Sequence, residues 1–402
     1  MEFENTADAV QPNERARPAR IDMHPSTGNP AAGHSLGAAN FSLMRFRNSG
    51  KNIRFSFRGV CGSRPPAGGK ISQAPRTETK VMRVRVFFHD RCFDGAAAAA
   101  VFSRFYSSKI RPDADFVYTG LVHRASQLFD EAQFDGDENA IVDFKYCSSP
   151  RLTWWFDHHQ SAFLTPDDAR HFQLDRSGKK FYDPDYRSCT KFVAAIARAR
   201  FGFEAPELAE LVEWADIIDG AQYPNAATAV RMEAPATQLT LVIEMGPDHD
   251  LLPRVIGMMA RLPLADIMKA PEVAALFKPL YERHLQSIDL IRERSRCDGG
   301  VVFFDLISLG LEGYSKFIPY YLFPESVYSV SVSPSSFRTK ISVGSNPWNT
   351  QPQMHNLATI CERYGGGGHA RVGAISFETG ALERARRVAG EIVEELQKSP
   401  ET

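Results

Sequence analysis

An apolar strand followed at once by a helix of small residues places the tightest constraint on the fold of this chain. Residues 81–88 read Val-Met-Arg-Val-Arg-Val-Phe-Phe, which alternate and then become continuously apolar, as a strand entering a sheet core does. Gly95 and the alanines at 96–100 lead into a helical stretch that reaches Phe105. Such small residues let a helix pack closely on a sheet, so this unit predicts a strand that continues into a helical crossover.

The same alternation of strands and helix-sized segments continues to about residue 245. Strands are expected at 115–119, 140–144 and 154–156, separated by helix-sized segments such as 125–133. Ser188 can cap a helix over 189–201, and Pro206 can open one over 207–218. Strands that alternate with helices are typical of an α/β domain with a mostly parallel sheet.

The remaining chain divides into an N-terminal extension, a helical part and a second mixed part. A long amphipathic stretch runs from about 251 to 294, strand-like runs return at 301–307, 327–332 and 340–343, and a last helix is expected at 380–398. Residues 1–80 carry 12 basic against 6 acidic residues, are rich in Pro, Gly, Ser and Asn, and are expected to be disordered. An inert extension is preferred there over a basic tail that binds an anionic partner. The predicted divisions are therefore 1–80, 81–245, 246–298 and 299–402.

Charge and cysteine content exclude several classes of protein. The 402 residues include 47 Lys and Arg against 48 Asp and Glu, a formal net charge of -1, which excludes the uniformly basic surface of a protein that coats nucleic acid. The six cysteines form no C-x-x-C pair, which disfavours a disulfide framework and a structural zinc site. No secretory signal and no apolar run of roughly 20 residues is found, so a cytoplasmic protein without a membrane segment is expected.

Four segments place carboxylates and imidazoles just beyond candidate strand ends, where open α/β sheets bind ligands. They are His89-Asp-Arg-Cys-Phe-Asp94-Gly95, Val142-Asp143-Phe144, Asp157-His158-His159 and Trp214-Ala-Asp216-Ile-Ile-Asp219. Singly, a strand-end Asp is better explained as a helix cap or an ion-pair partner, and an Asp-His-His triplet alone recurs by chance. Together, these donors suit Mn²⁺ or Mg²⁺ and suffice for two ions, which can hold both oxygens of an in-line displacement at phosphorus. The set therefore predicts a phosphoesterase.

A glycine run near the C-terminus gives a second signal. The segment 364–371 reads Tyr-Gly-Gly-Gly-Gly-His-Ala-Arg, and its bare backbone amides can approach an anion closely. The structural alternative is a flexible turn between a helix and a strand. Arg338, in the stretch 336–339, can clamp a phosphate with two hydrogen bonds or be an exposed strand residue.

In this order the segments resemble the DHH phosphoesterase family, named for the triplet 157–159. The likeness covers roughly residues 83–395, and the glycine run with Arg338 resembles the signatures of the C-terminal domain that accompanies the triplet. The resemblance implies an α/β protein with an N-terminal, mostly parallel DHH domain, a helical connector and a smaller C-terminal α/β domain, with the active site in the cleft between the two domains. Because family members range from RecJ-like exonucleases and nano-RNases to cyclic-dinucleotide phosphodiesterases and exopolyphosphatases, the fold is better determined than the substrate.

The resemblance also implies a role for each site residue. The expected catalytic residues are Asp157, His158 and His159. Two Mn²⁺ ions, with Mg²⁺ or Co²⁺ as alternatives, are expected on His89, Asp94, Asp143, Asp157, His158 and Asp216. Asp219, three residues further on and near the same helix face, competes with Asp216, and the sequence leaves this choice open. The expected substrate contacts are Arg338, Gly366, Gly367, Gly368, His369 and Arg371.

One departure from the family pattern concerns the first motif. Family members commonly carry a second carboxylate two residues before or after the position of Asp94, and here Cys92 and Ala96 stand there. Asp90, Cys92 as a soft ligand, or a water could complete the site. Since the other motif residues are present, an active enzyme is expected, with a catalytically degenerate nucleotide-binding protein as the alternative.

The expected substrates are short oligonucleotides or nucleotide phosphates, and exopolyphosphatase is the enzyme alternative. A processive exonuclease is disfavoured because no segment reads as an added OB-fold. Base stacking would separate the substrate classes, and Tyr364, Phe337 and Trp348 are candidate platforms, although core packing explains each more simply. The aromatic stretch 317–323 is expected in the core, with a dimer surface as the alternative, so a homodimer stays open.

Overall fold

The computed structural model describes residues 81–398, with gaps at 123–128, 247–249, 312, 336–337 and 352–354. The extension that is predicted to be disordered, 1–80, lies outside the described residues, as do Cys61 and Phe337. The divisions expected at 245 and 298 stay predictions. None of the described helices is both long enough and apolar enough to cross a membrane.

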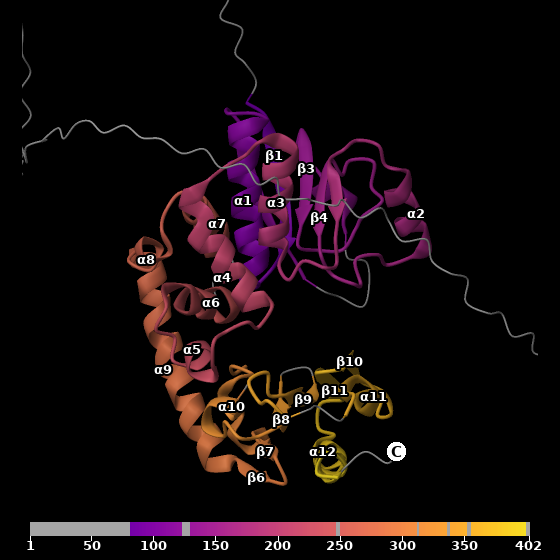
Figure 1. Ribbon diagram of the computed structural model, residues 1–402, viewed down its shortest axis with the longest axis vertical. Helices are drawn as coiled ribbons and strands as arrows, with labels where there is room; N and C mark the ends of the chain where they lie inside the picture. Colours follow the sequence, from indigo (N-terminus) through magenta and orange to yellow (C-terminus); the bar gives the residue numbers. More distant parts are fainter. Residues whose placement is uncertain are drawn as a thin grey trace, which may run out of the picture. The chain divides into compact units, whose positions relative to one another are not determined.

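Five parallel strands form the first sheet (Figure 1). They are β1 (Arg83–His89), β2 (Asp115–Leu121), β3 (Glu138–Val142), β4 (Trp154–Asp157) and β5 (Lys180–Tyr182). Their order is β2-β1-β3-β4-β5, and each neighbouring pair is parallel, which confirms the predicted sheet. The strand order reverses between β1 and β3, so the carboxyl ends of these two strands flank the usual ligand position of an open α/β sheet.

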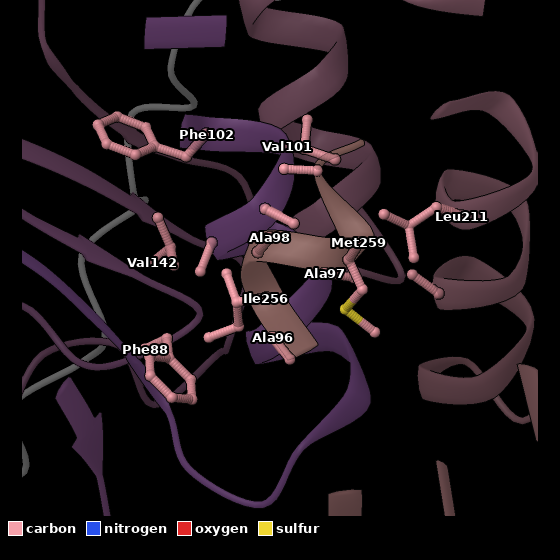
Figure 2. Close-up of a cluster of buried hydrophobic side chains, with 14 of the residues drawn as sticks. Phe88, Ala96, Ala97, Ala98, Val101, Phe102, Val142, Leu211, Ile256 and Met259 are labelled. Carbon is pink, nitrogen blue, oxygen red and sulfur yellow. The ribbon is translucent and has the colours of Figure 1, made fainter. Parts of the chain in front are cut away.

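Helices cover one face of this sheet through a core of small and aromatic residues. α1 (Phe93–Lys109) and α3 (Cys189–Phe201) pack there, together with α4 (Ala209–Asp219) and α7 (Leu251–Met259). Figure 2 shows the alanines of α1 between the sheet residues Phe88 and Val142 on one side and Leu211 and Met259 on the other. The alanines at 96–100 are fully buried, as the sequence predicts for a helix in close contact with a sheet.

The other face carries an aromatic cluster. Phe87 and Trp155 project there from β1 and β4, and Phe172 of α2 (Pro166–Leu174) packs against them. The segment expected to be helix-sized at 125–133 is not a full helix where it is described, because residues 131–133 form a single 3₁₀ turn. Both faces of the sheet are thus covered by packed side chains, so the carboxyl edge is where a ligand can reach it.

The helical part contains more breaks than its periodicity predicts. A 3₁₀ turn at Pro206–Leu208 precedes α4, and α5 (Ala226–Val230) and α6 (Pro235–Met245) follow it. The stretch expected as one amphipathic run over 251–294 is three helices: α7, α8 (Leu264–Ile267) and α9 (Pro271–Arg294). Pro263 immediately precedes α8 and Pro271 opens α9, because the fixed φ of a proline fits a helix start, although α9 also contains Pro279 in its interior.

A second, mixed sheet contains the C-terminal strands in the order β10-β11-β9-β8-β7-β6. They are β6 (Arg296–Asp298), β7 (Val301–Asp305), β8 (Tyr328–Pro334), β9 (Thr339–Ser345), β10 (Gly367–His369) and β11 (Val372–Phe377). α11 (Leu357–Glu362) and α12 (Leu382–Leu396) share its core, and a 3₁₀ turn at Ile307–Leu309 follows β7. The buried helix α10 (Ile318–Leu322) confirms the core interpretation of the aromatic stretch.

Candidate metal centre

The carboxyl ends of three neighbouring strands and the ends of two helices bring the predicted acidic and imidazole groups together. His89 ends β1, Asp143 follows β3 directly, and Asp157 ends β4. Asp94 lies in the first turn of α1, and Asp219 ends α4. Motifs that are far apart in the sequence therefore meet in one cluster, because parallel strands share their carboxyl edge.

Asp143 is the centre of this cluster. Its backbone has a φ of 58°, a left-handed conformation that costs a non-glycine residue about 1–2 kcal/mol. Its backbone N–H donates to the carbonyl of Phe156 at 2.9 Å. The carboxylate is 1% exposed and lies 3.3 Å from His158 Nε2 and 3.5 Å from His89 Nδ1. Strain held at a buried carboxylate between two imidazoles indicates a functional position.

Asp94 is fixed by the start of α3. Its carboxylate accepts hydrogen bonds from the backbone N–H of Cys189 at 2.6 Å and of Thr190 at 3.0 Å. Gly95 makes this placement possible, since a Cβ there would lie 2.4 Å from the carbonyl oxygen of His89. The glycine lets α1 begin against the end of β1 and holds Asp94 Oδ2 3.8 Å from His158 Nε2.

The two triplet histidines are oriented by acceptors. The backbone carbonyl of Tyr186 lies 3.0 Å from His158 Nδ1, and because a carbonyl only accepts, Nδ1 carries the proton. Nε2 faces the carboxylates, and once it gives up its proton its lone pair is placed to bind a metal, as in a metal-binding histidine. Asp157, fully buried, accepts from His159 Nδ1 at 2.7 Å and so orients a ring that is 36% exposed.

Crowded carboxylates perturb the ionisation of the cluster. Burial, with Asp143 and Asp219 nearby, raises the pKa of Asp94, and burial with Asp143 raises the pKa of Asp219 to about 6. Against the effect of burial, the surrounding carboxylates raise the pKa of His158 to about 10. Burial would raise the pKa of Asp143, but the contacts with His158 and His89 outweigh burial and lower it. The cluster thus holds protons that compensate for its negative charge, and a bound cation can replace them.

The donor atoms form three groups in which ligand atoms lie within 4.8 Å of one another. These groups are His89 with Cys92 and Asp143, Asp143 with His158 and His159, and Asp94 with His158 and Asp219. Several buried donor atoms in them have no hydrogen-bond partner among the described residues: both carboxylate oxygens of Asp143 and Nε2 of His158. Oxygen and nitrogen atoms that face one another in one buried space without a well-formed hydrogen bond fit divalent cations.

The two candidate carboxylates of the fourth motif have different surroundings. Asp219 Oδ2 lies 3.5 Å from His158 Nε2, inside the cluster. Asp216 Oδ2 instead pairs with Lys191 Nζ at 2.5 Å and belongs to none of the three donor groups. The sequence gives no signal for this pairing, because Lys191 lies on another helix, α3.

The predicted substrate residues of the glycine run lie in regular structure. Gly367, Gly368 and His369 form the edge strand β10, which pairs with β11, so this part is a strand rather than a flexible turn. A Cβ at Gly366 would lie 2.3 Å from the carbonyl oxygen of Ala374, so close packing alone requires a glycine there. His369 is exposed.

The two predicted arginine contacts are not brought together. Thr339 pairs with Phe377 and Gly344 pairs with Val372, so Arg338 precedes one end of β9 while Arg371 lies at the other. The seven residues of β9 separate them by roughly 20 Å along the strand. Arg338 contacts Ser376 Oγ at 3.0 Å, and Arg371 contacts Ser345 Oγ at 3.3 Å.

The candidate base platforms that the structure describes are packed within the protein. The indole N–H of Trp348 donates to the carbonyl of Tyr223 at 2.7 Å, and its ring packs against Phe317 at 5.4 Å. Tyr364 donates to Glu391 at 3.0 Å and packs against the core of the second sheet. The packing interpretation of both rings is therefore the one that the structure favours.

Comparison with known proteins gives structural but no sequence matches. No family model matches the chain, and no curated protein does. The pGpG-specific phosphodiesterase PggH from Vibrio cholerae is similar, with a TM-score of 0.58 and 18% identity over 78% of this chain and 98% of that one. An exopolyphosphatase-related protein from Bacteroides fragilis has a TM-score of 0.44 and 15% identity over 79% of this chain and 93% of that one. RecJ with Mn²⁺ from Thermus thermophilus has a TM-score of 0.46 and 12% identity over 78% of this chain and 52% of that one. The likeness to PggH confirms the α/β fold implied by the DHH motifs.

Proposed function

We propose that this protein is a metal-dependent phosphoesterase of the DHH type that hydrolyses phosphodiester or phosphomonoester bonds of short oligonucleotides or nucleotides. The observation that carries this proposal is the buried carboxylate of Asp143, whose two oxygens face His89 and His158 at the carboxyl edge of a parallel sheet. Such an arrangement can hold divalent cations, and cations held there can bind a phosphate oxygen of a substrate. The phosphodiesterase named by the similar structure acts on pGpG, a small phosphodiester of the same class.

The donor set fits two divalent ions, for which we propose Mn²⁺ with Mg²⁺ or Co²⁺ as alternatives. His89, Cys92 and Asp143 would hold one, and Asp94, His158 and Asp219 the other, beside Asp143. Asp219 thus replaces Asp216 in the proposed ligand set. Bound cations in such a site activate a water as the nucleophile and neutralise charge that develops on the phosphate.

The remaining residues position the reacting groups. Asp157 holds the ring of His159 through the contact at 2.7 Å, so that the exposed part of His159 can face the scissile phosphate. Gly366–Gly368, His369 and Arg371 stay proposed phosphate contacts at the β10 edge. Arg338 would contact substrate separately, because it lies at the opposite end of β9.

We also propose a cellular location. All five cysteines in the described residues are free thiols, which supports the proposed reducing, cytoplasmic location. A homodimer stays an open prediction.

The function can be tested by product release from the purified protein with Mn²⁺. The substrates would be pGpG, a short RNA, 3′-phosphoadenosine 5′-phosphate and polyphosphate, with the His158→Ala and Asp143→Asn variants as inactive controls. We expect release from nucleotide substrates that is lost in both variants. Release from polyphosphate alone would favour the exopolyphosphatase instead, and no turnover by folded, metal-loaded protein would favour the catalytically degenerate nucleotide-binding protein.

A further inference from the structure

A cavity of about 240 Å³ has Ile218, the chain neighbour of Asp219, in its wall. Its walls come from the end of α4, from α5, α6 and α9, and from residues 313–317. One side is apolar and includes Ile218, Leu241 and Met245. The rings of Tyr223 and Phe317 meet edge to face there with centroids 5.5 Å apart, which makes a firm aromatic wall.

Much of the polar lining is already satisfied within the protein. The hydroxyl of Tyr314 bonds to Ser331 Oγ at 2.6 Å, and His284 Nε2 lies 2.7 Å from the carbonyl of Val230. By contrast, Glu244 and Lys316 form no hydrogen bond or ion pair with another residue of the described chain, although Lys316 lies over the Phe317 ring. A mostly apolar cavity with a few convergent polar groups is typical of a small-ligand site.

The end of α4 connects this cavity with the metal centre. Ile218 of the wall is the chain neighbour of Asp219, one of the metal-site carboxylates. Lys316 and Glu244 line the same cavity, so it offers a cation for a phosphate and a carboxylate for the group attached to that phosphate. A nucleotide whose phosphate lies at the metal centre can therefore extend past Asp219 into the cavity.

The hydrogen-bonding capacity of Glu244 indicates which nucleotide base fits the cavity. Burial raises the pKa of Glu244 to about 7, so above that pH the group is an ionised carboxylate, which only accepts hydrogen bonds and has two oxygens side by side. Among the bases, guanine presents two adjacent donors, the ring N1–H and the 2-amino group. Adenine and cytosine place an acceptor beside their amino group, and uracil has one N–H between two carbonyls. A polyphosphate chain would be repelled by the carboxylate and would gain nothing from the apolar wall.

We infer that this cavity binds the guanine base of a nucleotide substrate, with Glu244 accepting from the base, Tyr223 and Phe317 packing against it and Lys316 contacting its phosphate. The inference rests on the proposed phosphoesterase function and narrows it to guanine nucleotides. Bases extruded into protein pockets are read in this way, by packing and by hydrogen bonds to their Watson–Crick edge.

The test is equilibrium binding of 5′-GMP and 5′-AMP to the full chain with Mn²⁺ by titration calorimetry at pH 8, where Glu244 is ionised. Turnover of pGpG and pApA is measured separately. We expect GMP to bind at least about tenfold more tightly than AMP, as two directed hydrogen bonds allow. Glu244→Gln and Glu244→Ala should reduce that ratio to near one. Glu272→Gln, exposed in the first turn of α9 and absent from the lining, is the matched control and should keep the ratio. Thermal unfolding of each variant shows whether it is folded.

Equal binding of GMP and AMP by the wild type, or a preference that survives in folded Glu244 variants, would overturn the inference. A preference of GMP over 2′-deoxy-GMP that disappears in Glu244→Gln would also overturn it, because Glu244 would then read the ribose. Since binding of GMP requires no turnover, loss of the guanine preference and absence of phosphoesterase activity remain separate results.

Discussion

Substituting Asp219 and Asp216 by asparagine should change the stability of the metal-free protein in opposite directions. Asp219 has its pKa raised from 3.8 to about 6, so the folded state holds its proton more tightly than the unfolded state does. The unfolding free energy therefore falls as pH rises from 3.8 to about 6, and the deficit persists above that range. Asp219→Asn removes the deficit.

The size of the effect follows from the same shift. At about 1.4 kcal/mol for each pH unit, the full deficit is about 3 kcal/mol. Because 29% of the Asp219 side chain is exposed, screening by solvent reduces it to about 1–2 kcal/mol. Asp216→Asn instead removes the ion pair with Lys191, whose side chain is 52% exposed, and should cost up to about 1 kcal/mol.

The assay is thermal unfolding at pH 8, in EDTA and then in saturating Mn²⁺. In EDTA, Asp219→Asn should raise Tm by about 1.5–3 °C, and Asp216→Asn should lower it slightly. Mn²⁺ should stabilise the wild type and Asp216→Asn by similar amounts and Asp219→Asn much less, since a ligand stabilises the state that binds it. If Asp219→Asn kept the full Mn²⁺ response while Asp216→Asn lost it, the assignment of Asp219 to the metal site would be refuted.

Three further changes test other parts of the site. Cys92→Ser should abolish the near-ultraviolet sulfur-to-cobalt absorption of the Co²⁺-loaded protein, and an unchanged spectrum would exclude the thiolate ligand. Gly95→Ala should lower Tm and Mn²⁺ affinity together, because its methyl group would meet the His89 carbonyl at 2.4 Å; normal values of both would contradict this packing argument. Arg371→Ala, which removes the cation beside the proposed phosphate contacts of β10, should raise KM for nucleotide substrates more than Arg338→Ala does, and equal effects would contradict this difference in role.

The sequence predicts the elements that packing determines. β1, β3 and β4 are apolar runs between helices, so their pattern alone indicates a buried parallel sheet. The sequence does not predict β5, β6 and β10, because three residues at the edge of a sheet carry too little pattern. Periodicity also overextended the helix near 251–294, where two prolines start new helices.

The candidate site was predictable to the level of motifs but not of partners. Strand-end acids and imidazoles converge because parallel strands share their carboxyl edge. The choice between Asp216 and Asp219 depended on Lys191 of another helix, which takes Asp216 as its partner. The separation of Arg338 from Arg371 follows from the register of β9 with β11, a long-range feature that local sequence does not encode.

The carboxylate of Asp94 has one further consequence. It receives the first backbone amides of α3, those of Cys189 and Thr190, while its Oδ2 lies near His158. A cation that binds this carboxylate withdraws electron density from it and so changes the hydrogen bonds that it accepts from these two amides. Their hydrogen-exchange rates therefore report on occupancy of the centre from within the backbone, in the absence of substrate, and local fraying at the start of α3 would loosen the centre at the same moment.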